Sequence, residues 1–239
     1  MIYDDTLTRE ELIEKHNIRF NKIFDYFKNY LEEKGFHKAL RALNKAYSFH
    51  SGVRKDGAPE FMHQLEICLF LTTLPQLPVN QTDLEDFFCA ALLHDLREDY
   101  GVSREEILNE YGHQVDNWVE LLTKEFNGIR KTDEDYFDGL RSNPLVALIK
   151  LADRFHNIST MQGAFNAHKQ KKYIKEVKDY FYPMMKYCLK NYPEYNLSFY
   201  TLKRTIEVLC QVIQSTLISS EVNNISINLS QQNTEDNRS

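Results

Sequence analysis

The stretch FFCAALLHDLREDY, residues 87–100, places ionisable residues directly after an apolar run, namely His94, Asp95, Glu98 and Asp99. If the stretch is helical, Glu98 lies four residues after His94 and Asp99 four after Asp95, so the four form one compact polar patch. Burying four such groups without a partner costs much free energy. The patch is therefore interpreted as a metal site, with Glu98 and Asp99 handling protons; the alternative is a solvated helix face.

Helical periodicity extends from this stretch in both directions. The first helix is expected to begin near Thr8, where TREE resembles a capping box. Further helices are expected over about 37–49, 61–74, 83–98, 104–110, 112–125, 133–141, 143–160, 169–191 and 197–219. Thr82 and Ser103 are predicted N-caps, and Pro183 is expected to kink or split its helix.

No alternating strand pattern accompanies these helices, so the sequence predicts an all-α fold. One domain is expected over about 8–220, with its motifs in 36–165 and its C-terminal helices in 169–219. The last stretch, 221–239, is polar and rich in Asn, Ser and Gln, and is expected to be a disordered tail.

Composition narrows the class of protein. The chain has 239 residues, of which 42% are hydrophobic, enough for one sizeable core. A net charge of −6 disfavours general nucleic-acid binding. The four cysteines form no CxxC pair and favour buried thiols in a reducing cytosol. The acidic N-terminus is unlike a signal peptide, and no apolar run approaches the ~20 residues of a membrane helix. A soluble, cytoplasmic protein is expected.

A second stretch, PLVALIKLADRFHNIST at 144–160, combines an apolar body with a polar stripe. Asp153, His156, Asn157 and Thr160 recur at i, i+3, i+4 and i+7, so they share one helix face. A hydrogen-bonded internal network is the alternative to a functional site here.

A third stretch, HSGVRKDGAPEFMHQLEI at 50–67, carries Arg54 and Lys55 before a Gly57–Pro59 turn, with His63 opening the next helix. Taken alone, such a histidine is more often structural, and two adjacent cations are usually surface residues.

The three stretches support one another. His63, His94, Asp95 and Asp153 make a mixed imidazole and carboxylate set, which suits Mn²⁺ or Fe²⁺, with Zn²⁺ as a further option. The cationic pair of the third stretch suits a phosphate group.

The order of these motifs resembles the HD superfamily of metal-dependent phosphohydrolases. RKDGAPEFMHQLEI (54–67), AALLHDLRED (90–99) and LIKLADRFHNISTM (148–161) resemble the hydrolase domain of the RelA/SpoT alarmone enzymes more closely. The resemblance covers about residues 36–165 and implies an HD-domain helical bundle. Only 79 residues follow Thr160, so a hydrolase without a synthetase half is expected.

The resemblance implies a role for each matching position. His63, His94, Asp95 and Asp153 match the metal ligands of the family, with one Mn²⁺ per chain as the usual cofactor. Glu98 and Asp99 match the acidic pair that positions or activates the attacking water. Arg54 and Lys55 match the phosphate-facing pair, and Asn157 and Thr160 match residues that contact the nucleotide.

The expected reaction is removal of the 3′-pyrophosphate of (p)ppGpp, giving GDP or GTP and pyrophosphate. Ser159 stands where the family often has Arg, and the segment from His50 to Arg54 is one residue shorter than the family pattern. These departures bear on which nucleotide binds. The alternatives are an HD phosphohydrolase for another nucleotide, such as a deoxynucleoside monophosphate, NADPH or an adenine alarmone, and a non-catalytic nucleotide sensor.

Overall fold

Helices build nearly all of the structure. The computed structural model describes residues 8–54 and 57–236. In chain order the elements are α1 (Arg9–Glu33), α2 (His37–Phe49), α3 (Met62–Thr72), α4 (Gln81–Leu93), α5 (Leu96–Tyr100), α6 (Arg104–Tyr111), α7 (His113–Leu122), β1 (Glu125–Phe126), β2 (Ile129–Arg130), α8 (Asp133–Arg141), α9 (Pro144–Ala164), α10 (Ala167–Glu176), the π-helical turn η1 (Val177–Phe181), α11 (Tyr182–Asn191), the 3₁₀ turn η2 (Pro193–Tyr195) and α12 (Asn196–Asp236). The expected all-α fold is confirmed.

Local capping signals set several helix starts. Thr8 and Glu11 form the expected capping box at α1, and the Ser103 hydroxyl accepts from the Glu106 N–H at α6 (3.1 Å). The prediction of Thr82 as a cap is wrong. Asn80 caps α4 instead, because its side-chain oxygen accepts from the Thr82 N–H (2.9 Å), which places Thr82 inside the first turn.

The expected break at Pro183 is confirmed. The pattern over 169–191 divides into α10, the π-helical turn η1 and α11, with Pro183 in the first turn of α11. Proline lacks the N–H that continues a helical ladder, and the π-turn directly before it absorbs the mismatch.

The single helix expected over 83–98 is interrupted, so this prediction is wrong. α4 ends at Leu93, and α5 begins at Leu96. The Nδ1 atom of His94 donates to the Ala91 carbonyl (2.7 Å), the oxygen that the next helical N–H would use. His94 and Asp95 therefore lie in the turn between two helices and not on the face of one.

A short hairpin is the second departure from the sequence-based expectation. β1 and β2 pair antiparallel, with Phe126 opposite Ile129, across a turn at Asn127 and Gly128. Both turn residues have positive φ, 51° and 78°, as the Asn-Gly hairpin turn requires. The Asn-Gly dipeptide is a hairpin signal that can be read from the sequence. The hairpin brings the chain back toward α5.

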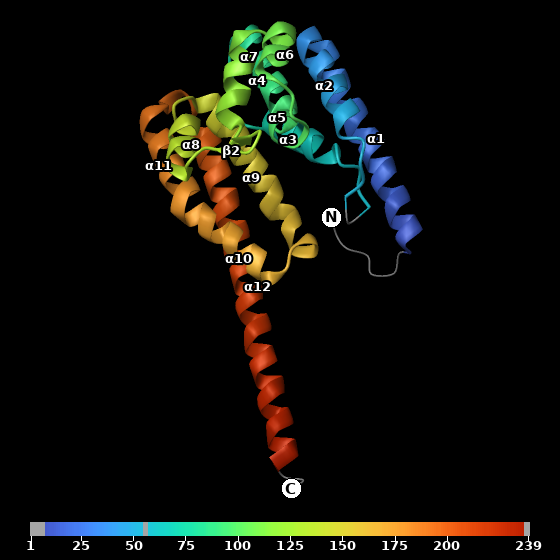
Figure 1. Ribbon diagram of the computed structural model, residues 1–239, viewed down its shortest axis with the longest axis vertical. Coiled ribbons are helices and arrows are strands. Elements are labelled where there is room, and N and C mark those ends of the chain that lie inside the picture. The colour runs from blue at the N-terminus through green and yellow to red at the C-terminus, as the bar shows by residue number, and fades with distance from the viewer. Residues whose placement is uncertain (1–7, 55–56, 237–239) are drawn as a thin grey trace.

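The hydrophobic core is organised around α9. Leu148, Ile149, Leu151 and Ala152 on α9 are buried, and α3, α8 and α12 pack against this helix. Figure 1 shows α9 and α12 running side by side. The four cysteines are free and buried, as expected. Within the described residues, no helix is long and apolar enough to cross a bilayer.

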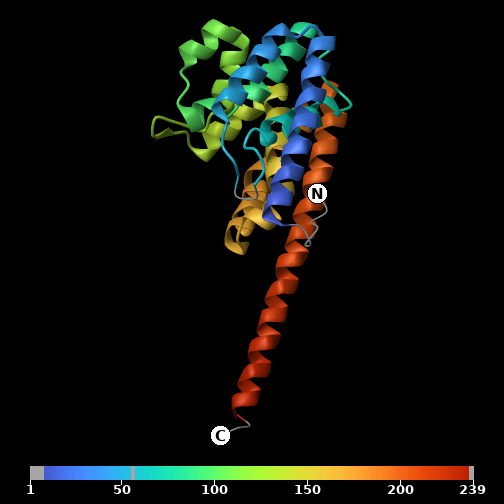
Figure 2. The same cartoon turned by 90° about the vertical axis from the view of Figure 1, so that its right-hand side faces the viewer.

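α12 extends far beyond the bundle (Figures 1 and 2). The sequence predicted a disordered tail over 221–239, whereas the structure continues α12 as helix to Asp236; residues 237–239 lie outside the described part. The stretch 196–236 contains neither Gly nor Pro, and extending an existing helix costs little compared with starting one. The polar composition of 221–236 is therefore compatible with helix, which the sequence-based expectation did not allow for.

Candidate metal centre

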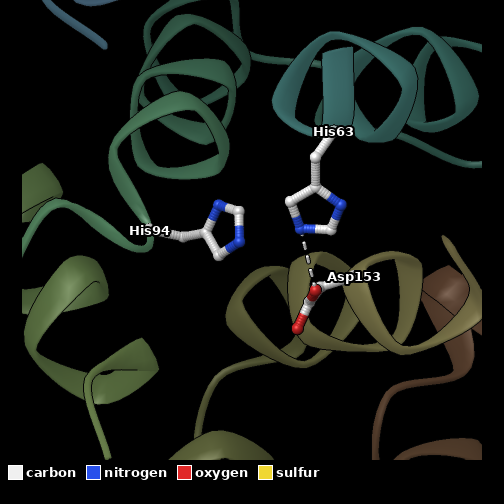
Figure 3. Close-up of side chains that lie close together, drawn as sticks. All are labelled: His63, His94 and Asp153. Carbon is white, nitrogen blue, oxygen red and sulfur yellow. Dashed lines mark ion pairs between the residues drawn. The ribbon is translucent and has the colours of Figure 1, made fainter. Parts of the chain in front are cut away.

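Three helical elements bring two imidazoles and a carboxylate together. His63 comes from the first turn of α3, His94 from the end of α4, and Asp153 from the middle of α9 (Figure 3). One ligand atom from each lies within 4.8 Å of the others. The His63 Nε2 and Asp153 Oδ1 atoms are 3.3 Å apart. This spacing leaves room for a cation between them after small side-chain movements.

Asp95, the fourth predicted ligand, lies beside this trio. Its Oδ2 atom is 2.9 Å from the Nε2 atom of His94 and 3.9 Å from that of His63. The turn between α4 and α5 places the carboxylate there, because Asp95 immediately precedes α5. The structure thus gathers all four predicted ligands in one place.

The imidazole of His94 is oriented for a cation. Its Nδ1 atom donates to the Ala91 carbonyl, which leaves the Nε2 atom to face the cluster. That Nε2 atom is buried and has no hydrogen-bond partner among the described residues, although Asp95 Oδ2 lies 2.9 Å away. A buried nitrogen of this kind is normally satisfied, so a divalent metal ion fits the donor set.

Charges in the cluster also favour a cation. Burial lowers the pKa of His94, but the charges of Asp95 and Asp153 raise it more strongly, to about 9. Burial raises the pKa of Asp153, but the charges of Lys150 (Nζ to Oδ2, 2.8 Å) and His94 hold it well below its usual range. A buried carboxylate, Asp153, and a half-buried one, Asp95, thus flank His94, and a proton on its ring occupies the place that a metal ion would take.

A pocket of about 260 Å³ opens onto this cluster. Its lining residues are His50, Arg54, Glu60, His63, Gln64, Asp95, Asp99 and Asn157. Partial burial, followed by the charges of Asp95 and Glu98, raises the pKa of Asp99 to about 6. Asn157 donates to Asp153 Oδ1 (2.6 Å) and so links the pocket wall to a predicted ligand. Arg54, Asp99 and Asn157, three of the predicted site residues, therefore line the same pocket.

Two other predicted residues, Glu98 and Thr160, do not line the pocket as described. Glu98 turns toward the hairpin, where its Oε1 atom accepts from the Lys124 and Glu125 N–H groups. The Thr160 hydroxyl donates to the His156 carbonyl (3.0 Å), a contact within its own helix. Lys55 lies outside the described residues. The interruption between α4 and α5 explains why Glu98 points toward the hairpin, because Glu98 and His94 no longer share a helix face.

Sequence reasoning missed several residues at the site. His50 is buried and lies between the Ala46 carbonyl, to which its Nδ1 donates (2.9 Å), and the Gln64 amide, which donates to its Nε2 (2.9 Å). Lys150 neutralises Asp153 from one helical turn earlier on α9. A lysine three residues before the aspartate, in an otherwise apolar run, was the only local signal.

Comparison with known proteins places the site in context. A family model described as HD domain matches residues 39–186. A guanosine-3′,5′-bis(diphosphate) 3′-pyrophosphohydrolase of Borreliella burgdorferi is 28% identical over 159 residues, covering 63% of this chain and 22% of that protein. The protein of the same name from Aquifex aeolicus is 34% identical over 138 residues, covering 55% and 18%. The chain spans about a fifth of the length of these curated relatives.

A similar solved structure is described as a metazoan ortholog of SpoT that hydrolyzes ppGpp and plays a role in starvation responses. It aligns with a TM-score of 0.54 and 21% sequence identity, covering 70% of this chain and 94% of that one. At this identity the likeness supports the fold, and it agrees with the helical bundle described above.

Proposed function

The chain belongs to the HD-domain family, and from this premise we propose that it is a metal-dependent hydrolase of (p)ppGpp. The proposed reaction removes the 3′-pyrophosphate, giving GDP or GTP and pyrophosphate. The names of the Borreliella and Aquifex relatives support this substrate. The observation that carries the proposal is the convergence of His63, His94 and Asp153 beside a pocket that Arg54 and Asp99 line.

His63, His94, Asp95 and Asp153 are the proposed ligands of one Mn²⁺ per chain. Two imidazole nitrogens and two carboxylates suit Mn²⁺, whereas thiolate-rich ligand sets select softer metals. A divalent ion held there supplies polarisation of a phosphoryl oxygen and a water of lowered pKa. Lys150 balances part of the ligand charge and keeps Asp153 ionised.

Asp99 is the proposed general base. A carboxyl group with a pKa of about 6 is largely ionised at neutral pH, yet it is basic enough to take a proton from an attacking water. Glu98, the other member of the predicted pair, acts indirectly in this proposal. Its charge is one cause of the raised pKa of Asp99, and its backbone contacts hold the hairpin beside the site.

Arg54 is the proposed phosphate-binding cation within the described residues. Its N–H donates to the Ala58 carbonyl (2.8 Å), and the adjacent bridge between Val53 and Pro59 closes the loop that holds it over the pocket. The pocket that Arg54 lines also borders His63 and Asp95, so a phosphate group bound to Arg54 would lie beside the proposed metal ligands. Lys55 and Thr160 keep the substrate-binding roles that the resemblance implies for them.

The test is product analysis. Mn²⁺-loaded protein is incubated with ppGpp, pppGpp, deoxynucleoside monophosphates, NADPH and an adenine alarmone, and phosphate and pyrophosphate are assayed separately. We expect GDP and intact pyrophosphate from ppGpp. Orthophosphate as the first product, or turnover of another nucleotide alone, would favour a different phosphohydrolase. Binding of ppGpp without turnover would favour a sensor.

Two matched variants test the assignment of the base. Asp99→Asn should lower kcat by about 10²–10⁴-fold, the range typical of general acid–base groups. Glu98→Gln keeps an oxygen that can accept from the hairpin N–H groups, so its kcat should fall less than that of Asp99→Asn. The reverse order would return the role of base to Glu98.

A further inference from the structure

His63 has a second polar contact, on the side of the ring that faces away from the metal site. Its Nδ1 atom lies 2.8 Å from the Nδ1 atom of His156, and the two rings meet edge to face at 70°. The Nε2 atom of His156 lies 2.7 Å from Glu66 Oε2, and Glu66 Oε1 lies 2.5 Å from an Arg19 guanidinium nitrogen. A continuous line of contacts thus joins a predicted metal ligand to α1.

The proton positions along this line follow from its last members. Burial raises the pKa of Glu66, but the hydrogen bond from His156 and the charge of Arg19 lower it below its usual value. The Glu66 carboxylate is ionised at neutral pH and can only accept, so His156 donates through Nε2. With its proton on Nε2, His156 accepts at Nδ1. His63 must therefore donate through its own Nδ1.

This arrangement leaves the Nε2 lone pair of His63 free on the opposite side of the ring. That atom faces Asp153 Oδ1 at 3.3 Å, where a carboxylate oxygen also offers only lone pairs. Two acceptors at this distance are stabilised by a cation between them. Metal-binding histidines commonly donate from their other ring nitrogen to a hydrogen-bond acceptor, which fixes the ring orientation and the tautomer. His156 is that acceptor for His63.

We propose that His156, Glu66 and Arg19 form a positioning relay that holds His63 in the metal-binding tautomer. The relay rests on the metal ligands assigned under the proposed function, but not on the identity of the nucleotide. Glu66 lies one helical turn after its neighbour His63 on α3, and His156 lies on α9. Arg19 binds the oxygen of Glu66 that His156 does not use, so it keeps the carboxylate from rotating away.

The relay is tested through metal affinity. The apparent Kd for Mn²⁺ is measured by competition with a chelator, and the melting temperature of the metal-free protein is recorded alongside. His156→Phe keeps an aromatic ring without nitrogens and should raise the Kd by about 10–100-fold, as the loss of such outer partners does elsewhere. Arg19→Met should raise the Kd by a smaller factor, and Arg19→Lys should recover most of the affinity.

Arg104→Met is the matched control for Arg19→Met. Arg104 also pairs with a carboxylate at 2.5 Å, that of Asp116, and its side chain is 49% exposed against 43% for Arg19. Its loss should leave the Kd for Mn²⁺ within about twofold of wild type. An equal rise for Arg104→Met would show a general structural effect and overturn the relay.

An unchanged Kd in folded His156→Phe would also overturn the relay, whichever nucleotide the protein hydrolyses. If that variant does not fold, Glu66→Leu and Arg19→Met decide the question in the same assay. Tight Mn²⁺ binding that depends on His156 and Arg19, without turnover of ppGpp, would support the relay and contradict the proposed substrate.

Discussion

The two ends of α4 bury charge in opposite ways. Near its start, Asp86 is buried and contacts the Lys38 ammonium, while Glu85 accepts from the Lys38 and Ala39 N–H groups (2.5 and 3.2 Å) at the start of α2. Each acid therefore has a partner supplied by the chain, and the contacts join α4 to α2. The polar groups at this end are fully used in holding two helices together.

The other end of α4 is left incomplete. Among the described residues, His94 has a buried nitrogen without a hydrogen-bond partner, beside the carboxylates of Asp95 and Asp153, and Lys150 pairs with Asp153 alone of these two. Buried charge that the chain itself pairs is costly to unpair, whereas buried charge that it leaves unbalanced creates a place for a ligand. The comparison predicts that substitutions near the start of α4 change stability, whereas substitutions at its end change metal binding.

The largest effect is expected at the incomplete end. His94→Ala and Asp153→Ala should reduce bound metal from about one ion per chain to almost none, because each removes a ligand from a four-ligand set. Elemental analysis after gel filtration measures this directly. Asp86→Asn is the control at the other end and should keep its metal. Near-stoichiometric metal in His94→Ala would remove His94 from the site.

A smaller effect is expected from Lys38→Met, and it concerns stability. Loss of one partner from a buried pair costs about 3–5 kcal/mol, and the lower end applies because the Lys38 side chain remains 22% exposed. Urea unfolding measures the change. Lys28→Met, which breaks an exposed pair with Glu32, should cost less than about 0.5 kcal/mol. Metal binding should be unaffected by either substitution.

The cost of Lys38→Met should depend on pH. Burial raises the pKa of Asp86 even with Lys38 present. Ionisation of Asp86 therefore costs the folded protein more free energy than ionisation of an ordinary carboxyl group. The cost should therefore be largest at neutral pH and shrink toward pH 4, as the unpaired carboxylate takes up a proton. A cost that is the same at both pH values would mean that Asp86 is not the group affected.

A still smaller effect is expected from Asp99→Asn in the metal-free protein. The pKa of Asp99 is raised to about 6, above its usual 3.8, so ionisation of this group weakens the folded state as the pH rises through 6. The variant should melt higher than wild type at about pH 8, by less than about 2 °C because the side chain is solvent-exposed, and equally near pH 4. A lower melting temperature at pH 8 would show that the carboxylate is stabilising.

The smallest effect is expected from removal of the chain after Ser220. The end of α12 projects away from the bundle (Figure 2), and most helical stability in proteins comes from packing against other elements. Melting temperature and turnover should both change by less than the error of the measurement. A large loss of either would indicate that this segment docks on the domain or on a second copy, which an oligomeric-state measurement would distinguish.

Local features of this protein could be predicted from its sequence. The capping residues Thr8 and Ser103, the split at Pro183 and most helix ranges depend on contacts between residues a few positions apart. The four predicted ligands also came together as expected, because three polar stretches embedded in apolar helices have few other ways to be buried. The Asn127–Gly128 hairpin was equally local and could have been predicted from its turn residues.

What the tertiary structure decided was the direction in which individual side chains point. Glu98 faces the hairpin because the helix is interrupted at His94, where a side chain replaces a backbone donor. His63 and His156 are 93 positions apart, and their contact exists only because α3 packs against α9. Periodicity assigns residues to a face of one helix, but hydrogen bonds between helices depend on packing angles and rotamers that no local pattern encodes.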